Sequence, residues 1–339
     1  MFRVPVITNG RKALMPTHQA RAREVVNSSR ATPFFHKGLY CIRLNNWTSE
    51  NVQLVSIGID PGSKKEAFTV MCEHHTLVNI QLDAVAHVKD AVEAKRNARR
   101  ARRFRKTPCR KPRYKQTRRK GWIPPSTKAR WDNKINTIKS LMSIYPISTV
   151  VAEDVSAKTM KNGKTWNKSF SPVQCGKNYF VESIKSLNLT LILKEGWESA
   201  ELRSKHSLTK SKAKMSNKWD AHCVDSWVLA TVPFVQTPEV NQSMIVAKPL
   251  RFYRRQLHVF QPAKGDVRKP YGSTRSLGLR RGSIIKHKTY GKCLVGGTSK
   301  GRISLHSISD NKRLTQNTKI EDVTFLCYNN WNYYFTSTR

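Results

Sequence analysis

The sequence predicts a mixed α/β fold, and three segments lead to this prediction. Residues 52–62 form a short apolar run rich in β-branched residues that stops at Asp60, a proline and a glycine, as a buried strand followed by a turn does. Residues 149–153 are a second run of this kind and end at Glu153. Residues 219–230 have the composition of a helix and carry further acids among apolar residues. Because these acids lie at the edges of apolar segments, we expect the fold to bring them together.

The net charge indicates a polyanionic partner. The 339 residues include 62 Lys and Arg but only 22 Asp and Glu, which gives a formal charge of +40. A field of this size attracts nucleic acid, and a membrane surface is the weaker alternative. The sequence has no apolar run of the roughly 18 residues that a membrane span needs, and residues 1–10 do not resemble a secretory signal.

The seven cysteines form no C-x-x-C pair, which favours a reducing compartment over a disulfide scaffold or a structural zinc site.

The first 50 residues have the pattern of a small module. Strands are expected at Val4–Ile7 and Leu39–Leu44, and a short basic helix is expected at Thr17–Asn27. Packing against the next domain and direct contact with nucleic acid explain this module equally well.

Three strands with short turns are expected next. The apolar run that ends at Asp60 is followed at hairpin spacing by Ala67–Met71 and Leu77–Leu82. This spacing predicts an antiparallel meander.

An arginine-rich segment follows the meander. Residues 95–120 hold 15 Lys or Arg and no acid. The first half, 91–105, has no Gly or Pro and is expected to form a helix surrounded by arginines, with no apolar stripe to pack in a core. Bound phosphates would stabilise such a helix, because guanidinium groups bind them bidentately; the alternative is a disordered basic tail. The second half carries Pro108 and Pro112 and is expected to be extended.

Four further elements are expected around the second acidic strand. Residues 131–145 have an apolar face at helical spacing and end before Pro146, which predicts an amphipathic helix. After the strand at 149–153 we expect a polar loop over 159–178, a helix over 179–187 and a strand over 189–193.

The segment after residue 233 is basic and then rich in short β-like runs. Lys and Arg clusters are broken by Gly and Pro, and from residue 282 the runs follow at close intervals, with turns expected at Gly296-Gly297 and Lys300-Gly301. This pattern predicts a small antiparallel barrel of about 60 residues, of the SH3-like type.

The order of these elements is that of RNase H-like nucleases. Such enzymes carry a carboxylate on the first strand, one on a later central strand and one on a late helix, here Asp60, Glu153 and Asp225. Hydrolysis of a phosphodiester by two metal ions about 3.5–4 Å apart requires several carboxylates at one place. Mg²⁺ prefers these hard oxygen ligands.

A histidine accompanies the last acid. His222 and Asp225 are three residues apart and share a face of the predicted helix, so His222 can position or deprotonate the attacking water while Asp225 holds a metal ion. Asp220 is a candidate for capping the helix or for supporting the site. Taken alone, an acid before Pro-Gly is most often a turn residue and a helical histidine is most often a packing residue. Their joint occurrence beside an arginine helix favours catalysis.

The motifs together resemble the IsrB/IscB family of transposon-encoded, RNA-guided nucleases, which are related to type II CRISPR effectors. The resemblance covers nearly the whole chain. It rests on Leu14-Met15-Pro16 (P-L-M-P, with Ala13 in place of the first Pro), Gly58-Ile59-Asp60-Pro61-Gly62 (first RuvC motif), Arg99-Arg100-Ala101-Arg102-Arg103 (R-R-x-R-R of the bridge helix), Trp122-Ile123-Pro124-Pro125-Ser126 (W-L-P-P-S), Glu153-Asp154-Val155 (second RuvC motif) and His222-x-x-Asp225 (third RuvC motif). Lys64-Lys65-Glu66-Ala67 departs from the small residues that many members carry there, which puts the form of the first hairpin in question.

The resemblance implies an RNase H-like (RuvC) catalytic site and an RNA partner. It assigns catalysis to Asp60, Glu153, His222 and Asp225, with two Mg²⁺ ions, or Mn²⁺ as a substitute, bound by Asp60, Glu153 and Asp225. It assigns the bridge helix to a guide RNA of the omega type and its heteroduplex with DNA, through Arg96, Arg99, Arg100, Arg102, Arg103 and Arg105.

The resemblance also implies a domain plan. The expected parts are a P-L-M-P-type module (1–50), RuvC part I (51–90), the bridge helix and basic extended segment (91–121), RuvC parts II and III (122–233), and a basic linker with a barrel that reads a short motif beside the target (234–339). The expected particle is one protein chain with guide RNA and double-stranded target DNA, without a membrane, in the nucleoid of a prokaryotic cytoplasm.

The length of chain between the second and third RuvC motifs decides which kind of family member the chain resembles. His222 follows Glu153 by 69 positions (222 − 153), and this interval holds only His206 and one cysteine, without the His and Asn cluster of an HNH domain. One active site cuts one strand, so the sequence predicts an IsrB-like nickase of the displaced strand. A guide-independent nuclease acting on branched DNA and a non-catalytic RNA-binding protein are the alternatives.

Overall fold

The computed structural model describes residues 3–46, 51–105, 122–155, 160–161, 164–165, 171–213, 215–249, 260–261, 266–267, 275–328 and 331–336. Contacts divide the chain into two compact units, one of residues 53–242 and one of residues 1–52 with 243–339. The five domain ranges expected from the sequence are finer than this division and stay predictions. The basic segment 106–121, expected to be extended, lies outside the described residues.

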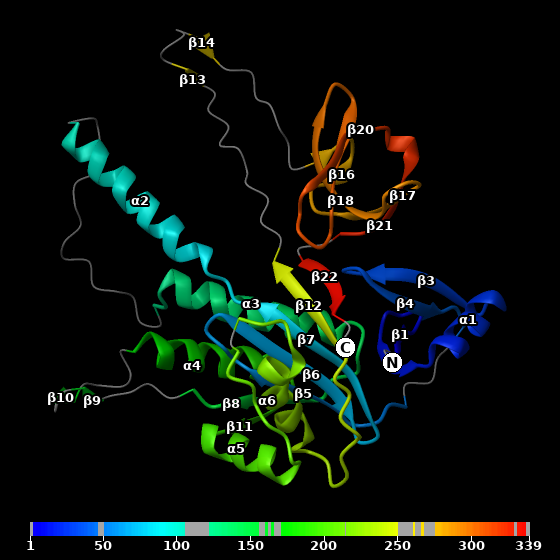
Figure 1. Ribbon diagram of the computed structural model, residues 1–339, viewed down its shortest axis with the longest axis vertical. Helices are drawn as coiled ribbons and strands as arrows, with labels where there is room; N and C mark the ends of the chain where they lie inside the picture. The colour runs from blue at the N-terminus through cyan, green and yellow to red at the C-terminus, as the bar shows by residue number, and fades with distance from the viewer. Residues whose placement is uncertain are drawn as a thin grey trace. The chain divides into compact units, whose positions relative to one another are not determined.

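The unit of residues 53–242 is built around a mixed sheet (Figure 1). Its strands run in the order β11-β8-β5-β6-β7. β5 (Val55–Asp60), β6 (Lys65–Cys72) and β7 (His75–Asp83) form the antiparallel meander that the sequence predicts. β8 (Thr149–Glu153) and β11 (Thr190–Lys194) continue the sheet in parallel on the other side of β5. The predicted mixed α/β fold is confirmed.

The helices of this unit lie between and after these strands in the sequence. They are α2 (His87–Phe104), α3 (Pro125–Met142), α4 (Pro172–Lys185), α5 (Gly196–Lys205) and α6 (Trp219–Thr231), and a short hairpin of β9 (Met160–Lys161) and β10 (Lys164–Thr165) lies between α3 and α4 in the sequence. Among the residues that the structure describes, no helix is long and apolar enough to cross a membrane.

The start of α4 corrects one prediction. The sequence suggested a loop up to residue 178, but the helix begins at Pro172. The Ser171 hydroxyl accepts a hydrogen bond from the Val173 amide, and proline at the first helical position fits because its missing N–H would have no partner there. These start signals outweigh the polar composition of the first turns.

Two alternate residues of β5, Ser56 and Gly58, allow α6 to pack closely against the sheet. The Ser56 hydroxyl donates to the Ala230 carbonyl at 2.5 Å. At Gly58, a Cβ would lie 1.9 Å from the Ser226 carbonyl oxygen, so only glycine permits this approach. Because alternate strand residues share a face, Asp60 also faces α6.

The other face of the sheet packs on α3. Thr69 of β6 bonds the Ser226 hydroxyl of α6 at 2.8 Å, and the residues of opposite parity in β6 therefore point away from α6. Among them, Glu66 accepts a hydrogen bond from Lys134 of α3 at 2.6 Å, and both side chains are buried. The sheet is thus enclosed between α6 and α3.

The second unit contains a small α/β module at its N-terminal end. Strands β1 (Val4–Ile7), β2 (Ala13–Thr17), β3 (Ala31–His36) and β4 (Leu39–Leu44) run in the order β2-β1-β4-β3, and α1 (Gln19–Asn27) packs on them. The strands expected at Val4–Ile7 and Leu39–Leu44 are confirmed, whereas β3 was not predicted.

The C-terminal part of this unit is an antiparallel sheet. Its order is β20-β19-β18-β17-β21, formed by β17 (Ile284–His287), β18 (Gly291–Ser299), β19 (Arg302–His306), β20 (Arg313–Thr318) and β21 (Val323–Cys327) after the 3₁₀ turn η3 (Ile320–Asp322). β12 (Met244–Pro249) pairs with β22 (Trp331–Thr336), β13 (Phe260–Gln261) with β14 (Asp266–Val267), and β15 (Arg275–Ser276) with β16 (Leu279–Arg280).

The prediction of a turn at Gly296-Gly297 is wrong. Both glycines lie inside β18, where the register with β19 shifts between Val295 and Thr298. A Cβ at Gly296 would lie 2.4 Å from the Ser304 hydroxyl, so the glycine permits the close approach of β18 and β19 at this bulge and does not form a turn.

Candidate active site

The ends of two parallel strands bring the first two acids together. Ile59 of β5 pairs with Ala152 of β8, so Asp60 and Glu153 follow in register at the same edge of the sheet. Adjacent strands lie about 4.8 Å apart, and register partners in a parallel pair share a face. The start of α5 lies against this edge, because a Cβ at Gly196 would be 3.0 Å from the Glu153 Oε1 atom.

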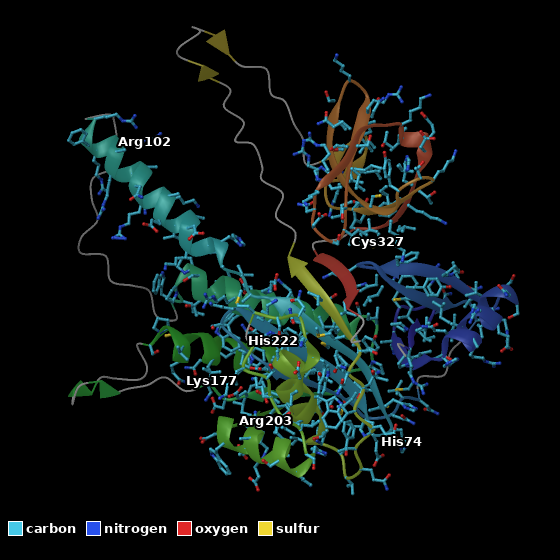
Figure 2. The ribbon with its side chains drawn as sticks, in the orientation of Figure 1. His74, Arg102, Lys177, Arg203, His222 and Cys327 are labelled. Carbon is cyan, nitrogen blue, oxygen red and sulfur yellow. The ribbon has the colours of Figure 1, made fainter. Side chains whose placement is uncertain are left out.

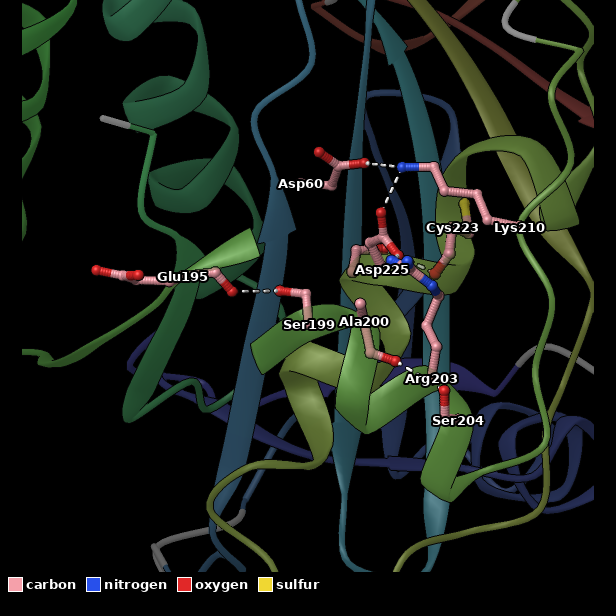
Figure 3. Close-up of polar contacts among 10 residues, drawn as sticks. Asp60, Glu195, Ser199, Ala200, Arg203, Ser204, Lys210, Cys223 and Asp225 are labelled. Carbon is pink, nitrogen blue, oxygen red and sulfur yellow. Dashed lines mark hydrogen bonds and ion pairs between the residues drawn. The ribbon is translucent and has the colours of Figure 1, made fainter. Parts of the chain in front are cut away.

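The third acid reaches the same place from α6. Asp225 is buried, and its Oδ2 atom contacts the Lys210 Nζ atom. The same nitrogen lies 3.2 Å from the Asp60 Oδ2 atom, so one ammonium group bridges the two carboxylates (Figure 3). Arg203 of α5 contacts the other oxygen of Asp225. Asp60 and Asp225, 165 positions apart in sequence (225 − 60), therefore lie within two hydrogen-bond lengths of each other.

Burial and crowding of like charges raise the pKa of two of these carboxyl groups. Burial raises the pKa of Asp60; Lys210 opposes this shift and Asp225 adds to it. Burial also raises the pKa of Glu153, and the negative charges of Asp60 and Asp225 raise it further. For Lys210, burial lowers the pKa but the two aspartates outweigh it, so the amine stays protonated. Three carboxylates thus face two cations, and negative charge is left to attract another cation.

His222 bonds the segment before α6. Its Nε2 atom lies 3.0 Å from the Ser216 carbonyl oxygen. A carbonyl oxygen only accepts hydrogen bonds, so Nε2 carries the proton and Nδ1 is the basic nitrogen of the neutral ring. Burial lowers the pKa of His222, which keeps the imidazole neutral near pH 7.

Asp220 does not cap α6. The N-cap residue is Lys218, and Asp220 lies in the first turn, where a carboxylate is favoured by the helix dipole. Its backbone oxygen accepts a hydrogen bond from the Ser211 amide at 3.0 Å. Asp154, next to Glu153, is held by Lys177 of α4 at 2.7 Å.

The donor set fits a divalent cation. Carboxylate oxygens are the ligands that Mg²⁺ and Mn²⁺ prefer, and Lys210 already places a positive charge between two of them. Within the described part of the chain, no three His, Cys, Asp or Glu side chains are arranged so that they alone could hold an ion. Arg203 and Lys210 take up the oxygens of Asp225 instead.

Two residues of this site were missed by the sequence analysis. Arg203 and Lys210 fall in a stretch that the sequence marks only as basic. The helix that carries Arg203 does have a signal, because Glu195 and Glu198 form a capping box at its start. Lys210 lies in a loop and has no distinguishing pattern around it.

The arginine-rich helix forms as predicted. α2 has no buried residue, and positions 91–105 are all exposed. Figure 2 labels Arg102 on this helix. The six arginines that the sequence analysis assigned to RNA lie in this exposed stretch: Arg96, Arg99, Arg100, Arg102, Arg103 and Arg105.

Acids from two parallel strand ends and a late helix define a carboxylate-centred α/β protein of the kind found among metal-dependent nucleases. The family model described as RRXRR protein matches residues 4–170. Over these residues the chain is similar to the RRXRR family, the family of the IscB/IsrB-associated domain, and this similarity indicates a nuclease.

Comparison with solved structures finds only distant similarity. Two structures of Thermus thermophilus RuvC, one of them in complex with a Holliday junction substrate, share 10% and 11% sequence identity with this chain. Each match covers 52% of this chain, and 90% and 91% of the RuvC chains, at a TM-score of 0.26. No curated protein matches the chain.

Proposed function

We propose that this protein is an RNA-guided endonuclease that nicks the displaced, non-target strand of DNA at one RuvC-type site. The observation that carries the proposal is the meeting of Asp60 and Asp225 at the Lys210 ammonium, with Glu153 in register beside Asp60. These oxygens come from two strand ends and one helix, which gives a rigid frame to a reaction that needs closely placed charges.

The proposed chemistry is hydrolysis of a phosphodiester. Asp60, Glu153 and Asp225 would hold two Mg²⁺ ions, which when bound activate a water molecule and stabilise the leaving oxygen. The Nδ1 atom of His222 accepts the proton from the attacking water, since Nε2 already donates to Ser216. Arg203 orients the Asp225 carboxylate by holding one of its oxygens.

One catalytic site implies one cut. The 68 residues between Glu153 and His222 contain no His and Asn cluster for a second nuclease domain. We therefore propose a nick in one strand, as the IsrB-like resemblance implies.

Exposed arginines support the proposed RNA partner. A helix without a buried residue has little packing to fix it, and its charge suits a groove lined by phosphates. Base pairing with an omega-type guide would supply the sequence specificity, and the C-terminal sheet would read a short motif in double-stranded target DNA. The proposed particle is a single protein chain with its RNA, acting in the nucleoid of a prokaryotic cytoplasm.

A plasmid assay tests this proposal. Protein expressed with the noncoding sequence that flanks its gene is incubated with supercoiled plasmid carrying the matching target and Mg²⁺. The expected product is open circular DNA, and none is expected from Asp60→Asn or when Mg²⁺ is chelated. Glu182→Gln removes the same charge from the exposed face of α4 and is expected to nick like the wild type.

Two results would replace the proposal with an alternative. Equal nicking by RNA-free protein would indicate a guide-independent nuclease, which branched DNA substrates would then reveal. RNA binding with identical behaviour of wild type and Asp60→Asn on every DNA would indicate a non-catalytic RNA-binding protein.

A further inference from the structure

The ammonium group of Lys210 lies between Asp60 and Asp225, where the proposed reaction needs a divalent metal ion. Its Nζ atom contacts one oxygen of Asp60 and one oxygen of Asp225, and both are proposed metal ligands. The second oxygen of Asp225 is held by Arg203. An ion that binds Asp60 and Asp225 together must therefore compete with Lys210.

The backbone around Lys210 is anchored on both sides. Before it, the Leu208 amide donates to the Arg203 carbonyl at 2.9 Å. After it, the Ser211 amide donates to the Asp220 carbonyl at 3.0 Å, and Ser216 bonds His222. The backbone next to Lys210 is thus bonded to α5 on one side and to α6 on the other.

The Lys210 side chain has a route away from the carboxylates. It is 34% exposed, whereas the side chain of Asp225 is 5% exposed. A lysine has four rotatable methylene groups, and its ammonium is strongly hydrated in water. The side chain can leave the site without unfolding the loop.

We propose that the Lys210 ammonium is a stand-in for the divalent ion: it holds Asp60 and Asp225 together in the metal-free protein and leaves them when the ion binds. The identity of the ion rests on the proposed function. The exchange lowers the affinity of the protein for metal, because each ion must displace a bound positive charge.

Mn²⁺ binding to the metal-free full-length protein, without RNA or DNA, tests this exchange. We expect Lys210→Met to bind Mn²⁺ at least about tenfold more tightly than the wild type in titration calorimetry, since one unit charge a few ångströms from the ion is removed. The matched control is Lys212→Met, which removes the same charge from an exposed position two residues away and is expected to change the affinity by less than about twofold. Adding Asp60→Asn to Lys210→Met should abolish the gain.

A second measurement needs no variant. Amine-reactive labelling of the wild type, read by mass spectrometry, should modify Lys210 more as Mn²⁺ is added, while labelling of Lys212 stays constant. Unchanged labelling of Lys210 at Mn²⁺ saturation would overturn the inference, as would equal or weaker Mn²⁺ binding by Lys210→Met, or no binding by either protein.

These outcomes are separate from those of the plasmid assay. Mn²⁺ binding that tightens in Lys210→Met, in a protein that does not nick DNA, supports the exchange and overturns the proposed function. Nicking by a protein whose Mn²⁺ affinity does not depend on Lys210 supports the proposed function and overturns the exchange.

Discussion

Replacing Gly58 with alanine tests the packing that places Asp225 opposite Asp60. The added Cβ would lie 1.9 Å from the Ser226 carbonyl oxygen and 2.5 Å from the Ala230 nitrogen, and both atoms belong to the backbone of α6. Real Cβ atoms essentially never approach closer than 3.0 Å, so α6 must move by about 1 Å.

The cost follows from what this movement disturbs. Overpacking alone costs about 1–3 kcal/mol. The same movement stretches the 2.5 Å bond from Ser56 to Ala230 and the 2.8 Å bond from Thr69 to Ser226, each contributing about 1 kcal/mol. We expect Gly58→Ala to lower the free energy of unfolding by about 3–5 kcal/mol. In protein that stays folded, a shift of about 1 Å in Asp225 should reduce nicking about 100-fold.

Urea unfolding followed by circular dichroism measures the loss of stability, and single-turnover nicking measures the loss of activity. Gly10→Ala is the matched control, because a Cβ there would meet only the Thr8 hydroxyl, at 3.7 Å. If Gly58→Ala unfolded at the same urea concentration as Gly10→Ala, the close approach of β5 to α6 would be refuted.

Three further predictions concern the fold and the arginine helix. Lys134→Met should cost about 3–5 kcal/mol at pH 7, because Glu66 would be left buried without its cation. Burial raises the pKa of Glu66, so the folded protein takes up its proton at a higher pH than the unfolded chain does. The loss should therefore shrink as the pH falls; equal urea midpoint shifts at pH 7 and pH 5 would contradict this. Trp227→Phe should cost about 1–3 kcal/mol in thermal unfolding, since the Nε1 atom donates to the Thr76 hydroxyl at 2.9 Å in the core, and an unchanged melting temperature would count against it. Replacing the four arginines of Arg99–Arg103 with alanine should change the unfolding free energy by less than about 0.5 kcal/mol, yet lower the slope of log K for RNA against log salt by up to about 3; a slope equal to that of the wild type would exclude these contacts.

Periodic patterns made much of the fold predictable from the sequence. The strand at Thr149–Glu153 has the bounds that its apolar run suggests, and the meander follows from three such runs with short turns. Every residue of α6 except Asp220 is buried, and its apolar composition identified the helix within one residue at each end. The strands were predictable because burial on both sides of a sheet selects an uninterrupted apolar sequence.

The missed parts depend on long-range contacts. Arg203 and Lys210 are charged residues in a charged stretch, and only the fold reveals that they lie beside Asp225. The glycines at 296 and 297 carry the signal of a turn, but both lie inside β18, and Gly296 permits its close approach to Ser304 of β19. Asp60 and Glu153 end neighbouring strands, so their proximity was predictable, whereas Asp225 lies in the middle of α6 and the cations between the acids carry no signal in the sequence.

The exposure of α2 has a consequence for how this helix is maintained. A stretch of 15 exposed residues, 91–105, gains little from tertiary burial, and like charges within one turn repel each other. Its helicity should then depend on bound polyanions and on ionic strength more than on the stability of the sheet. The RNA proposed as the partner would act as the folding template of α2, so that binding this RNA and completing the helix would become one event.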